Sequence, residues 1–304
     1  MKGFKPAVFI RGIAMGAADI VPGVSGGTIA FITGIYDELI ESLKSCNVQA
    51  LRLLFQSGPI AFWKHINGVF LLSLMLGIVT SVLSLARAIS YVLHHYPLPL
   101  AALFSGLILA SALIVYRQIP NASRQIAWLL FGVAFALLIG DIRPAEISAT
   151  PLNLFLSGAL AICAMILPGI SGSFILLLLG MYQPVIDAIK SADIVAMLYF
   201  VGGCGFGLIL FVRLLSWLMH SHRPTLLASL TGILLGSLSI IWPWKLDANS
   251  QLLSESLAPG WQNVTPWTYS QFADSQLYLA LLLAAVGIVL VGFIEWVATK
   301  YNHF

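Results

Sequence analysis

The chain has 304 residues, of which 59% are hydrophobic and only 9% are charged, and its formal net charge is +3. A soluble domain carries roughly 25% charged residues, so this chain has too few charges to cover a water-facing surface of its size. No basic cluster is dense enough to follow a phosphate backbone. The composition therefore excludes a soluble enzyme and a nucleic-acid-binding protein, and it predicts an all-α polytopic membrane protein.

Six apolar stretches are expected to cross a membrane as helices, although residues 125–140 are short for a span. Each is free of Asp, Glu, Lys and Arg, and a spanning helix needs roughly 20 mostly apolar residues. Pro97 and Pro99 are expected to separate the first two of these helices, because proline cannot continue a helix from the preceding turn. The six predicted spans are residues 66–86, 88–116, 125–140, 194–212, 224–244 and 275–294.

Two further apolar regions, residues 12–36 and 153–186, are interrupted near their middle by the sequence Pro-Gly-x-Ser-Gly. Proline lacks the backbone N–H, and glycine adopts backbone angles that other residues avoid, so neither region can continue as one helix. Each region is predicted to form two half-helices joined at membrane depth. The predicted hinge residues are Pro22, Gly23, Pro168 and Gly169.

The distribution of basic residues predicts how these regions meet the membrane. If both broken regions turn back as re-entrant hairpins and the N-terminus is cytoplasmic, eleven Lys and Arg residues lie in the cytoplasm and four lie outside. This bias follows the positive-inside rule. The sequence thus predicts six spans, two re-entrant hairpins and two cytoplasmic termini. Residues 46–66 would form a cytoplasmic connector with an interfacial helix, and residues 245–276 would form an outer loop.

The two broken regions are copies of one another. A shift of 146 residues places residues 12–45 over residues 158–191, with thirteen of the 34 positions identical. Three crossings per unit would put the second copy upside down, which is the inverted-repeat plan of many secondary transporters. The predicted halves are residues 1–145 and 146–304 of a single transmembrane domain. A shift of 126 residues continues the match at Arg87/Arg213, Ser90/Ser216, His94/His220, Gly106/Gly232 and Ser111/Ser237.

The starts of the second half-helices offer groups that can bind an anion. Backbone N–H groups in the first turn of a helix lack helical partners, and glycines let a phosphate approach the backbone closely. We therefore expect a phosphate site between the two tips. The alternative is that the glycines serve only as tightly packed hinges. The predicted binding residues are Ser25, Gly26, Gly27, Thr28, Ser171, Gly172 and Ser173.

Arg87 and Arg213 occupy matching places within apolar helices. A guanidinium group can bind a phosphate through two parallel hydrogen bonds, so both arginines are predicted to contact the substrate. The alternative is that the long side chains extend to the membrane surface and keep their charges in water.

Asp19 stands three residues before Pro22 and is matched by Met165 in the second copy. A carboxylate at membrane depth is costly and indicates a function, so Asp19 is predicted to couple transport to a proton. The alternative is that it caps the neighbouring half-helix. Three further acidic residues near the end of the first hairpin are expected to be solvated: Asp37, Glu38 and Glu41.

Neither catalysis nor a metal or cofactor is expected. The turns at residues 23–26 and 169–172 match the G-x-S-G pattern of rhomboid-like intramembrane serine proteases. A nucleophilic serine needs an adjacent base, however, and no histidine lies at the centre of a predicted span, so a protease is the weakest alternative. Cys46, Cys163 and Cys204 are far apart and lack the spacing of metal ligands.

The sequence GIAMGAADIVPGVSGGT at residues 12–28, followed by Gly-Ile-Tyr at 34–36, resembles the signature of a bacterial membrane family that was long a domain of unknown function. That family is associated with the translocation of polyprenyl phosphate. The second Pro-Gly-x-Ser-Gly copy and the apolar profile extend the resemblance over essentially the whole chain.

The resemblance implies a flippase for undecaprenyl phosphate in the bacterial cytoplasmic (inner) membrane. Such a protein would return the carrier lipid to the inner leaflet after its use in peptidoglycan and other envelope polymers. Its partners would be the polyprenyl-phosphate lipid and the surrounding membrane lipids. The residues alone leave an exporter of small anions as the alternative, and they leave open a homo-oligomer and coupling to protons or sodium.

Overall fold

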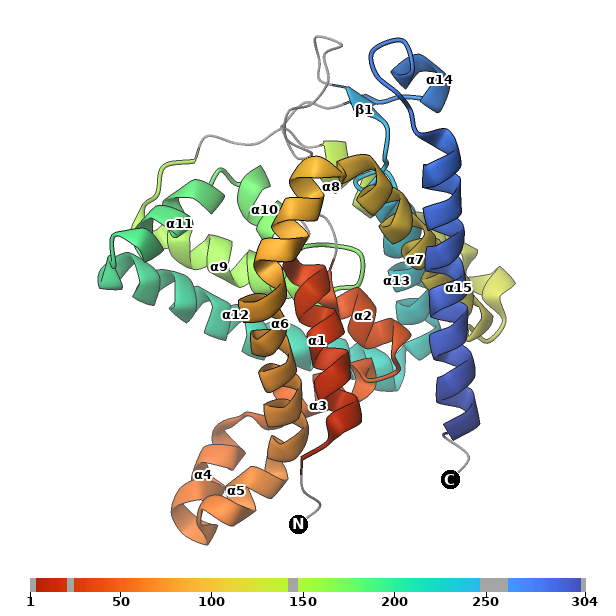
Figure 1. Cartoon of the computed structure of the whole chain (residues 1–304). Helices are drawn as coiled ribbons and strands as arrows, with labels where there is room; N and C mark the ends of the chain where they lie inside the picture. Colours follow the sequence, from red (N-terminus) through yellow and green to blue (C-terminus); the bar gives the residue numbers. More distant parts are fainter. Residues whose placement is uncertain (1–3, 21–24, 142–146, 247–261, 302–304) are drawn as a thin grey trace.

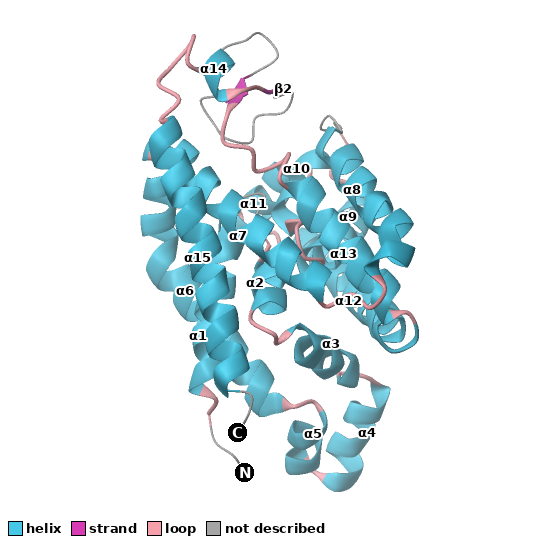
Figure 2. Cartoon of the chain, turned by 90° about the vertical axis from the view of Figure 1, so that its right-hand side faces the viewer, coloured by secondary structure: helices cyan, strands magenta, loops and turns pink. Residues whose placement is uncertain are grey.

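The computed structural model describes residues 4–20, 25–141, 147–246 and 262–301, and these are almost entirely helical (Figures 1 and 2). Both termini lie at one end of the molecule, and the short strands lie at the other (Figure 1). The elements are α1 (Pro6–Ile20), α2 (Gly26–Ile32), α3 (Tyr36–Ser45), α4 (Val48–Ser57), α5 (Pro59–His65), α6 (Gly68–His95), α7 (Pro97–Arg117), η1 (Ala122–Gln125), α8 (Ile126–Asp141), α9 (Pro151–Ile166), α10 (Gly172–Leu178), α11 (Tyr182–Lys190), α12 (Ile194–Ser221), α13 (Arg223–Ser237), β1 (Lys245–Leu246), β2 (Gln262–Asn263), α14 (Pro266–Tyr269) and α15 (Leu277–Tyr301).

Both apolar regions that carry the Pro-Gly-x-Ser-Gly sequence are broken helices, as the sequence predicts. α1 stops before this sequence and α2 starts at its last glycine, Gly26, and α9 and α10 are arranged in the same way around Gly172. A second break follows in each copy, at Gly34 with φ +71° and at Gly180 with φ +66°. Only glycine adopts such angles at little cost. After the second of these turns, α10 and α11 are bent by 107° relative to each other.

In the described part of the chain, four helices are long and apolar enough to cross a membrane, and the bent pair α10–α11 would make a fifth. These four correspond to the first four predicted spans, and α6 and α7 separate at Pro97 as expected. Large apolar side chains on the outer faces of α6, α12 and α15 are exposed, among them Leu83, Leu198 and Val289. A surface so apolar requires lipid around it, so the chain is a multi-pass membrane protein.

The fifth predicted span is not helical to its end. α13 stops at Ser237 and has 15 residues, fewer than the roughly 20 that a spanning helix needs. Beyond it, the indole N–H of Trp242 donates to the carbonyl of Val264 at 2.8 Å, and that of Trp244 donates to the carbonyl of Ser275 at 2.9 Å. The two tryptophans therefore leave the helix to bind the loop that precedes α15.

Helices α1 and α6 pack along one another, and so do α9 and α12. In each pair, glycines of one helix lie against backbone carbonyl groups of the other, with no room for a side chain. The contacts are related by the same shifts of 146 and 126 residues that relate the two halves of the sequence. They are Gly12 to Leu74 and Gly77 to Phe9 in α1–α6, and Gly158 to Phe200 and Gly203 to Phe155 in α9–α12.

A second set of glycine contacts joins α7 to α15 and α13 to α8. These contacts also correspond between the halves, with a shift of 126 residues for α7 and α13 and of 155 residues for α8 and α15. The sequence comparison had not revealed the last shift. The contacts are Gly106 to Ala284 and Gly287 to Leu103 in α7–α15, and Gly232 to Leu129 and Gly132 to Ser229 in α13–α8.

The connector after α3 forms two short helices rather than one. α4 begins after Asn47, whose side chain accepts hydrogen bonds from two backbone N–H groups, and ends at Gly58, which has φ +85° and separates it from α5. Leu51, Phe55 and Ile60 are exposed, Phe55 to 80%. Figure 1 shows α4 and α5 at the same end of the molecule as the two termini.

The opposite end carries the antiparallel strands β1 and β2 and the short helix α14 (Figure 1). Lys245 at the start of β1 is buried, and its ammonium group donates a hydrogen bond to the carbonyl of Ile240. Burial disfavours the charged form and lowers the pKa of Lys245 to about 7.

Candidate site at the junction of the two broken helices

The start of α2 is bonded directly to the break between α9 and α10, 140 residues further along the chain. The hydroxyl of Ser25 lies 3.2 Å from the carbonyl oxygen of Met165 and 3.1 Å from that of Leu167, so it can donate to either. The same oxygen accepts a hydrogen bond from the N–H of Gly27 at 3.1 Å. Ser25 is only 1% exposed. Its hydroxyl therefore serves both as the cap of α2 and as a link between the halves.

Thr28 makes the second link between the halves. Its hydroxyl oxygen accepts a hydrogen bond from the N–H of Gly169 at 2.9 Å, and Thr28 is 2% exposed. Gly27 fits between these two contacts because it has no side chain: a Cβ atom there would lie 2.6 Å from the carbonyl oxygen of Ile166. The tip of the first broken helix thus packs tightly on the break of the second.

Asp19 links the two parts of the first broken helix, because it lies in α1 and bonds to the start of α2. Its carboxylate oxygen Oδ1 accepts a hydrogen bond from the N–H of Gly26 at 2.7 Å. The equivalent residue in the second copy, Met165, has no side-chain oxygen that could accept from the N–H of Gly172. Asp19 therefore caps the start of α2, which is the alternative role expected from the sequence. Its role in proton coupling stays a prediction.

The second tip is bonded within itself. The hydroxyls of Ser171 and Ser173 lie 2.7 Å apart, so one donates to the other. Phe174 stands where the first copy has Thr28, and it has no hydroxyl to offer. A Cβ atom at Gly172 would lie 2.7 Å from the carbonyl oxygen of Ala161, which belongs to the same broken helix.

The predicted hinge residues are only partly within the described residues. Gly169 has φ +90°, the left-handed region in which glycine is unstrained, and it follows Pro168 in the turn between α9 and α10. Pro22 and Gly23 lie outside the described residues.

Arg87 and Arg213 are placed on the long helices α6 and α12, and both are exposed. Within the described part of the chain, no hydrogen bond or ion pair joins either guanidinium group to the tip residues. Their predicted role as phosphate contacts therefore stays a prediction.

The three acidic residues near the end of the first hairpin are half exposed, as expected, and they also make specific contacts. Glu38 forms an ion pair with Lys5 at 2.9 Å, and Asp37 forms one with Arg223 at 2.8 Å. Glu41 accepts a hydrogen bond from Ser216 of α12. The matching of Ser90 with Ser216 and of Lys44 with Lys190 was the only sequence signal near these contacts.

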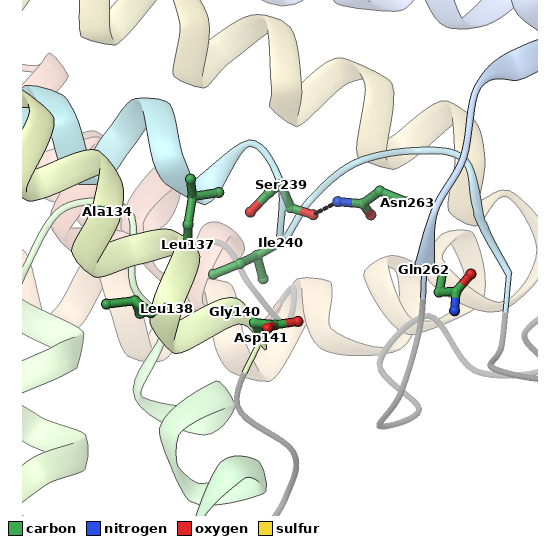
Figure 3. Close-up of a pocket in the computed structure, with 9 residues that line it drawn as sticks. All are labelled: Ala134, Leu137, Leu138, Gly140, Asp141, Ser239, Ile240, Gln262 and Asn263. Carbon is green, nitrogen blue, oxygen red and sulfur yellow. Dashed lines mark hydrogen bonds between the residues drawn. The ribbon is translucent and has the colours of Figure 1, made fainter.

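The three cysteines are free, and the described residues contain no cluster of His, Cys, Asp or Glu that could hold a metal ion. Figure 3 shows a pocket of about 800 Å³ between the end of α8, the turn after α13 and strand β2. Asn263 there donates to the carbonyl of Ser239 at 2.8 Å. None of the predicted binding residues lines this pocket. The lining residues are Ala134, Leu137, Leu138, Gly140, Asp141, Ser239, Ile240, Gln262 and Asn263.

A multi-pass membrane protein whose broken helices bring a polar junction into an apolar bundle has the architecture of membrane transporters. The chain belongs to the undecaprenyl phosphate translocase-like family, whose model matches residues 15–257.

Two relatives are similar over most of their length. The chain is 46% identical over 291 residues to a polyprenyl-phosphate transporter of Vibrio cholerae serotype O1, covering 93% of this chain and 94% of the relative. It is 31% identical over 267 residues to a polyprenyl-phosphate transporter of Staphylococcus aureus, covering 80% of this chain and 88% of the relative. No solved structure matches the chain significantly.

Proposed function

We propose that the protein moves polyprenyl phosphate, and specifically undecaprenyl phosphate, between the leaflets of the bacterial cytoplasmic membrane. The observation that carries the proposal is the junction at which Ser25 and Thr28 of one broken helix meet residues 165–169 of the other. The family and the names of both relatives support the substrate. The protein is thus a transporter rather than an enzyme, and it returns the carrier lipid to the inner leaflet for reuse.

The two halves form an inverted repeat. The repeated sequence and the matching glycine contacts of α1–α6 with α9–α12, and of α7–α15 with α13–α8, support this arrangement. Each half contributes one re-entrant hairpin and three further helices, and the hairpin tips meet near the membrane midplane. Two equivalent halves can exchange their conformations, so that one site opens first to one side of the membrane and then to the other.

Both hairpins return to the side from which they start, and both termini are cytoplasmic. The eleven-to-four distribution of basic residues supports this topology. Single cysteines placed beside Lys44 and Lys64 should react with a membrane-impermeant thiol reagent only from the cytoplasmic side. Reaction only from outside would show that the first broken region crosses the membrane.

The headgroup binds between the tips, where small residues let a phosphate approach the backbone when the tightly packed tips separate. In this structure Ser25 and Thr28 are bonded to the second hairpin, whereas the hydroxyls of Ser171 and Ser173 bond to each other and to no further partner among the described residues. The serine pair is therefore the readier donor to a phosphate oxygen. Gly26, Gly27 and Gly172 complete the site through their backbone N–H groups, once those of Gly26 and Gly27 release Asp19 and Ser25, to which they donate in this structure. The prenyl tail stays in the bilayer while the phosphate crosses.

Arg87 and Arg213 supply positive charge to the phosphate as the conformation changes. Replacing either by alanine should remove a charge-assisted contact of about 1.5–3 kcal/mol and lower the transport rate. Arg124→Ala is a matched control because Arg124 is an exposed arginine in η1, away from the proposed path.

The experiment that tests this function measures leaflet exposure of the lipid in reconstituted vesicles. A membrane-impermeant phosphatase reports how much polyprenyl phosphate reaches the outer leaflet over time. We expect the protein to accelerate the exchange of polyprenyl phosphate and to leave uptake of inorganic phosphate unchanged. Uptake of inorganic phosphate without lipid exchange would identify a small-anion transporter instead.

A further inference from the structure

A half-exposed polar cluster around the buried Ser216 joins the first half of the chain to the second at the end of the molecule that carries the termini. The hydroxyl of Ser216 on α12 donates to the carboxylate of Glu41 on α3 at 2.5 Å and accepts from the ammonium of Lys44 at 2.7 Å. Ser216 is 0% exposed, and Lys44 and Glu41 form an ion pair at 3.5 Å. One hydroxyl on α12 thus connects two opposite charges on α3.

Two further contacts lie between the same elements. The ring nitrogen Nδ1 of His220 lies 3.9 Å from Glu41, and the guanidinium of Arg223, at the start of α13, donates to Asp37 at 2.8 Å. All of these contacts hold α3 of the first half to α12 and α13 of the second half.

Each residue of the cluster has an equivalent in the other half. The shift of 146 residues places Glu41 on Asp187 and Lys44 on Lys190, and the shift of 126 residues places Ser216 on Ser90 and His220 on His94. In an inverted repeat the equivalent contact would join α11 to α6 on the opposite side of the membrane. The residue types needed for it are present in the sequence.

The structure does not pack α11 on α6 in the way that it packs α3 on α12. α11 packs against α12, and it has no packing with α6 comparable to that of α3 with α12 in the described part of the chain. The carboxylate of Asp187 accepts a hydrogen bond from Gln183 of its own helix at 2.9 Å. The difference extends to the helix starts: Tyr36 of α3 is 2% exposed, whereas Tyr182 of α11 is 38% exposed.

We propose that Glu41, Lys44 and Ser216 form the gate that closes the end of the transporter carrying the termini, and that Asp187, Lys190 and Ser90 form the corresponding gate of the other end. The first gate is closed in this structure. At the other end, α11 is not packed on α6 in the described part of the chain as α3 is on α12, so the second gate is open. The two gates close in alternation, so that the junction of the broken helices is never open to both sides. This assignment rests on the inverted repeat proposed above.

The ion pair between Asp37 and Arg223 strengthens only the first gate. Its equivalents in the other half are Gln183 and Pro97, which cannot form an ion pair. The protein without substrate should therefore rest with the end that carries the termini closed, as in this structure.

Cysteine crosslinking of the second gate tests the proposal without any substrate. Cys46, Cys163 and Cys204 are replaced by alanine, and Gln183→Cys with Pro97→Cys serves as the reporter pair, because their equivalents Asp37 and Arg223 are in contact at the closed gate. A flexible bifunctional thiol reagent then measures how often α11 approaches α7 in the purified, reconstituted protein.

Adding Ser216→Ala should raise the crosslinking rate of the reporter pair about tenfold, a change that corresponds to about 1.4 kcal/mol. Asp37→Asn, which removes an exposed ion pair, should also raise the rate without endangering the fold. Ser45→Ala is the matched control, because its hydroxyl bonds only to the carbonyl of Ser42 in the same helix. It should leave the rate unchanged.

The proposal is overturned if Ser216→Ala and Asp37→Asn both crosslink at the rate of Ser45→Ala. Because the measurement contains no lipid substrate, it can succeed even where polyprenyl phosphate proves to be the wrong substrate. Conversely, the vesicle assay could show lipid exchange while the crosslinking rate of the reporter pair does not change in any variant. That result would support the proposed function and contradict the proposed gate.

Discussion

The two broken helices share a sequence framework but use it differently. In the first, Asp19 caps Gly26, and Ser25 and Thr28 reach the second. In the second, Met165 and Phe174 occupy the places of Asp19 and Thr28, and the hydroxyls bond only to one another. The duplication therefore produced one tip that holds the halves together and another whose hydroxyls are the proposed donors to a phosphate. The shared Pro-Gly-x-Ser-Gly sequence determines where each helix breaks. The neighbouring residues determine which groups the tip of each broken helix bonds to.

The largest expected effect comes from filling the space at Gly27. Gly27→Ala would place a methyl group against the carbonyl of Ile166, and overpacking of this kind costs about 1–3 kcal/mol. We expect a lower temperature of unfolding in detergent and more than a tenfold loss of lipid exchange in vesicles.

Gly205→Ala is the control for this substitution, since nothing lies within 4 Å of the position where its Cβ would be. It should leave transport intact and stabilise α12 slightly, because alanine favours a helix more than glycine does. Equal effects of the two substitutions would mean that the tip is not tightly packed.

The next largest effect distinguishes the roles of the two tips. The first tip is bonded to the second half of the chain, and the second tip is the proposed donor to the phosphate. Thr28→Val keeps the shape of the side chain but leaves the buried N–H of Gly169 without its acceptor, which should cost about 1–3 kcal/mol of stability. Ser173→Ala should cost little stability and instead weaken lipid exchange. Thermal unfolding and the vesicle assay, measured on both variants, distinguish the two roles. If Ser173→Ala lowered stability as much as Thr28→Val and left transport unchanged, the contrast between the tips would be wrong.

Asp19 offers a direct way to make the first broken helix resemble the second. Asp19→Met copies the residue of the second tip and removes the cap of Gly26, at a cost of about 1 kcal/mol. Asp19→Asn retains an oxygen acceptor but removes the titrating group. If Asp19 couples transport to protons, Asp19→Asn should flatten the pH profile of the transport rate. A wild-type rate and pH profile in Asp19→Asn would leave Asp19 as a cap alone.

The smallest expected effect concerns the loop after α13, which the first half lacks. The pKa of Lys245 is lowered to about 7 in the folded protein by burial, so between about pH 7 and the normal lysine range the unfolded chain binds a proton that the folded chain does not. Stability therefore rises with pH across this window. Lys245→Met should stabilise the protein more at pH 6 than at pH 9, as followed by thermal unfolding. A difference that is the same at both pH values would contradict the buried amine.

Local features of the fold could be predicted from the sequence because they depend on neighbouring residues. Proline and glycine at residues 168–169 end α9, and uncharged stretches of about 20 residues become α6 and α7. The early end of α13 could not be predicted, because it depends on hydrogen bonds from Trp242 and Trp244 to a distant loop.

The candidate site was predictable only in part, for the same reason. The duplicated motif indicated which residues would form the tips. It could not show that Ser25 and Thr28 are bonded to protein while Ser171 and Ser173 are not, because those partners are set by packing between halves. The contact of Glu41 with Ser216 spans 175 residues, and no local pattern indicates it.

The central claim is that the two tips form one site that is reached from each side of the membrane in turn. Thiol accessibility of Ser173→Cys, in a chain without its three native cysteines, tests this most directly. The account predicts that a membrane-impermeant reagent modifies this cysteine in both right-side-out and inside-out vesicles, and that polyprenyl phosphate protects it in both. Modification from one side only, or no protection by the lipid on either side, would contradict the claim.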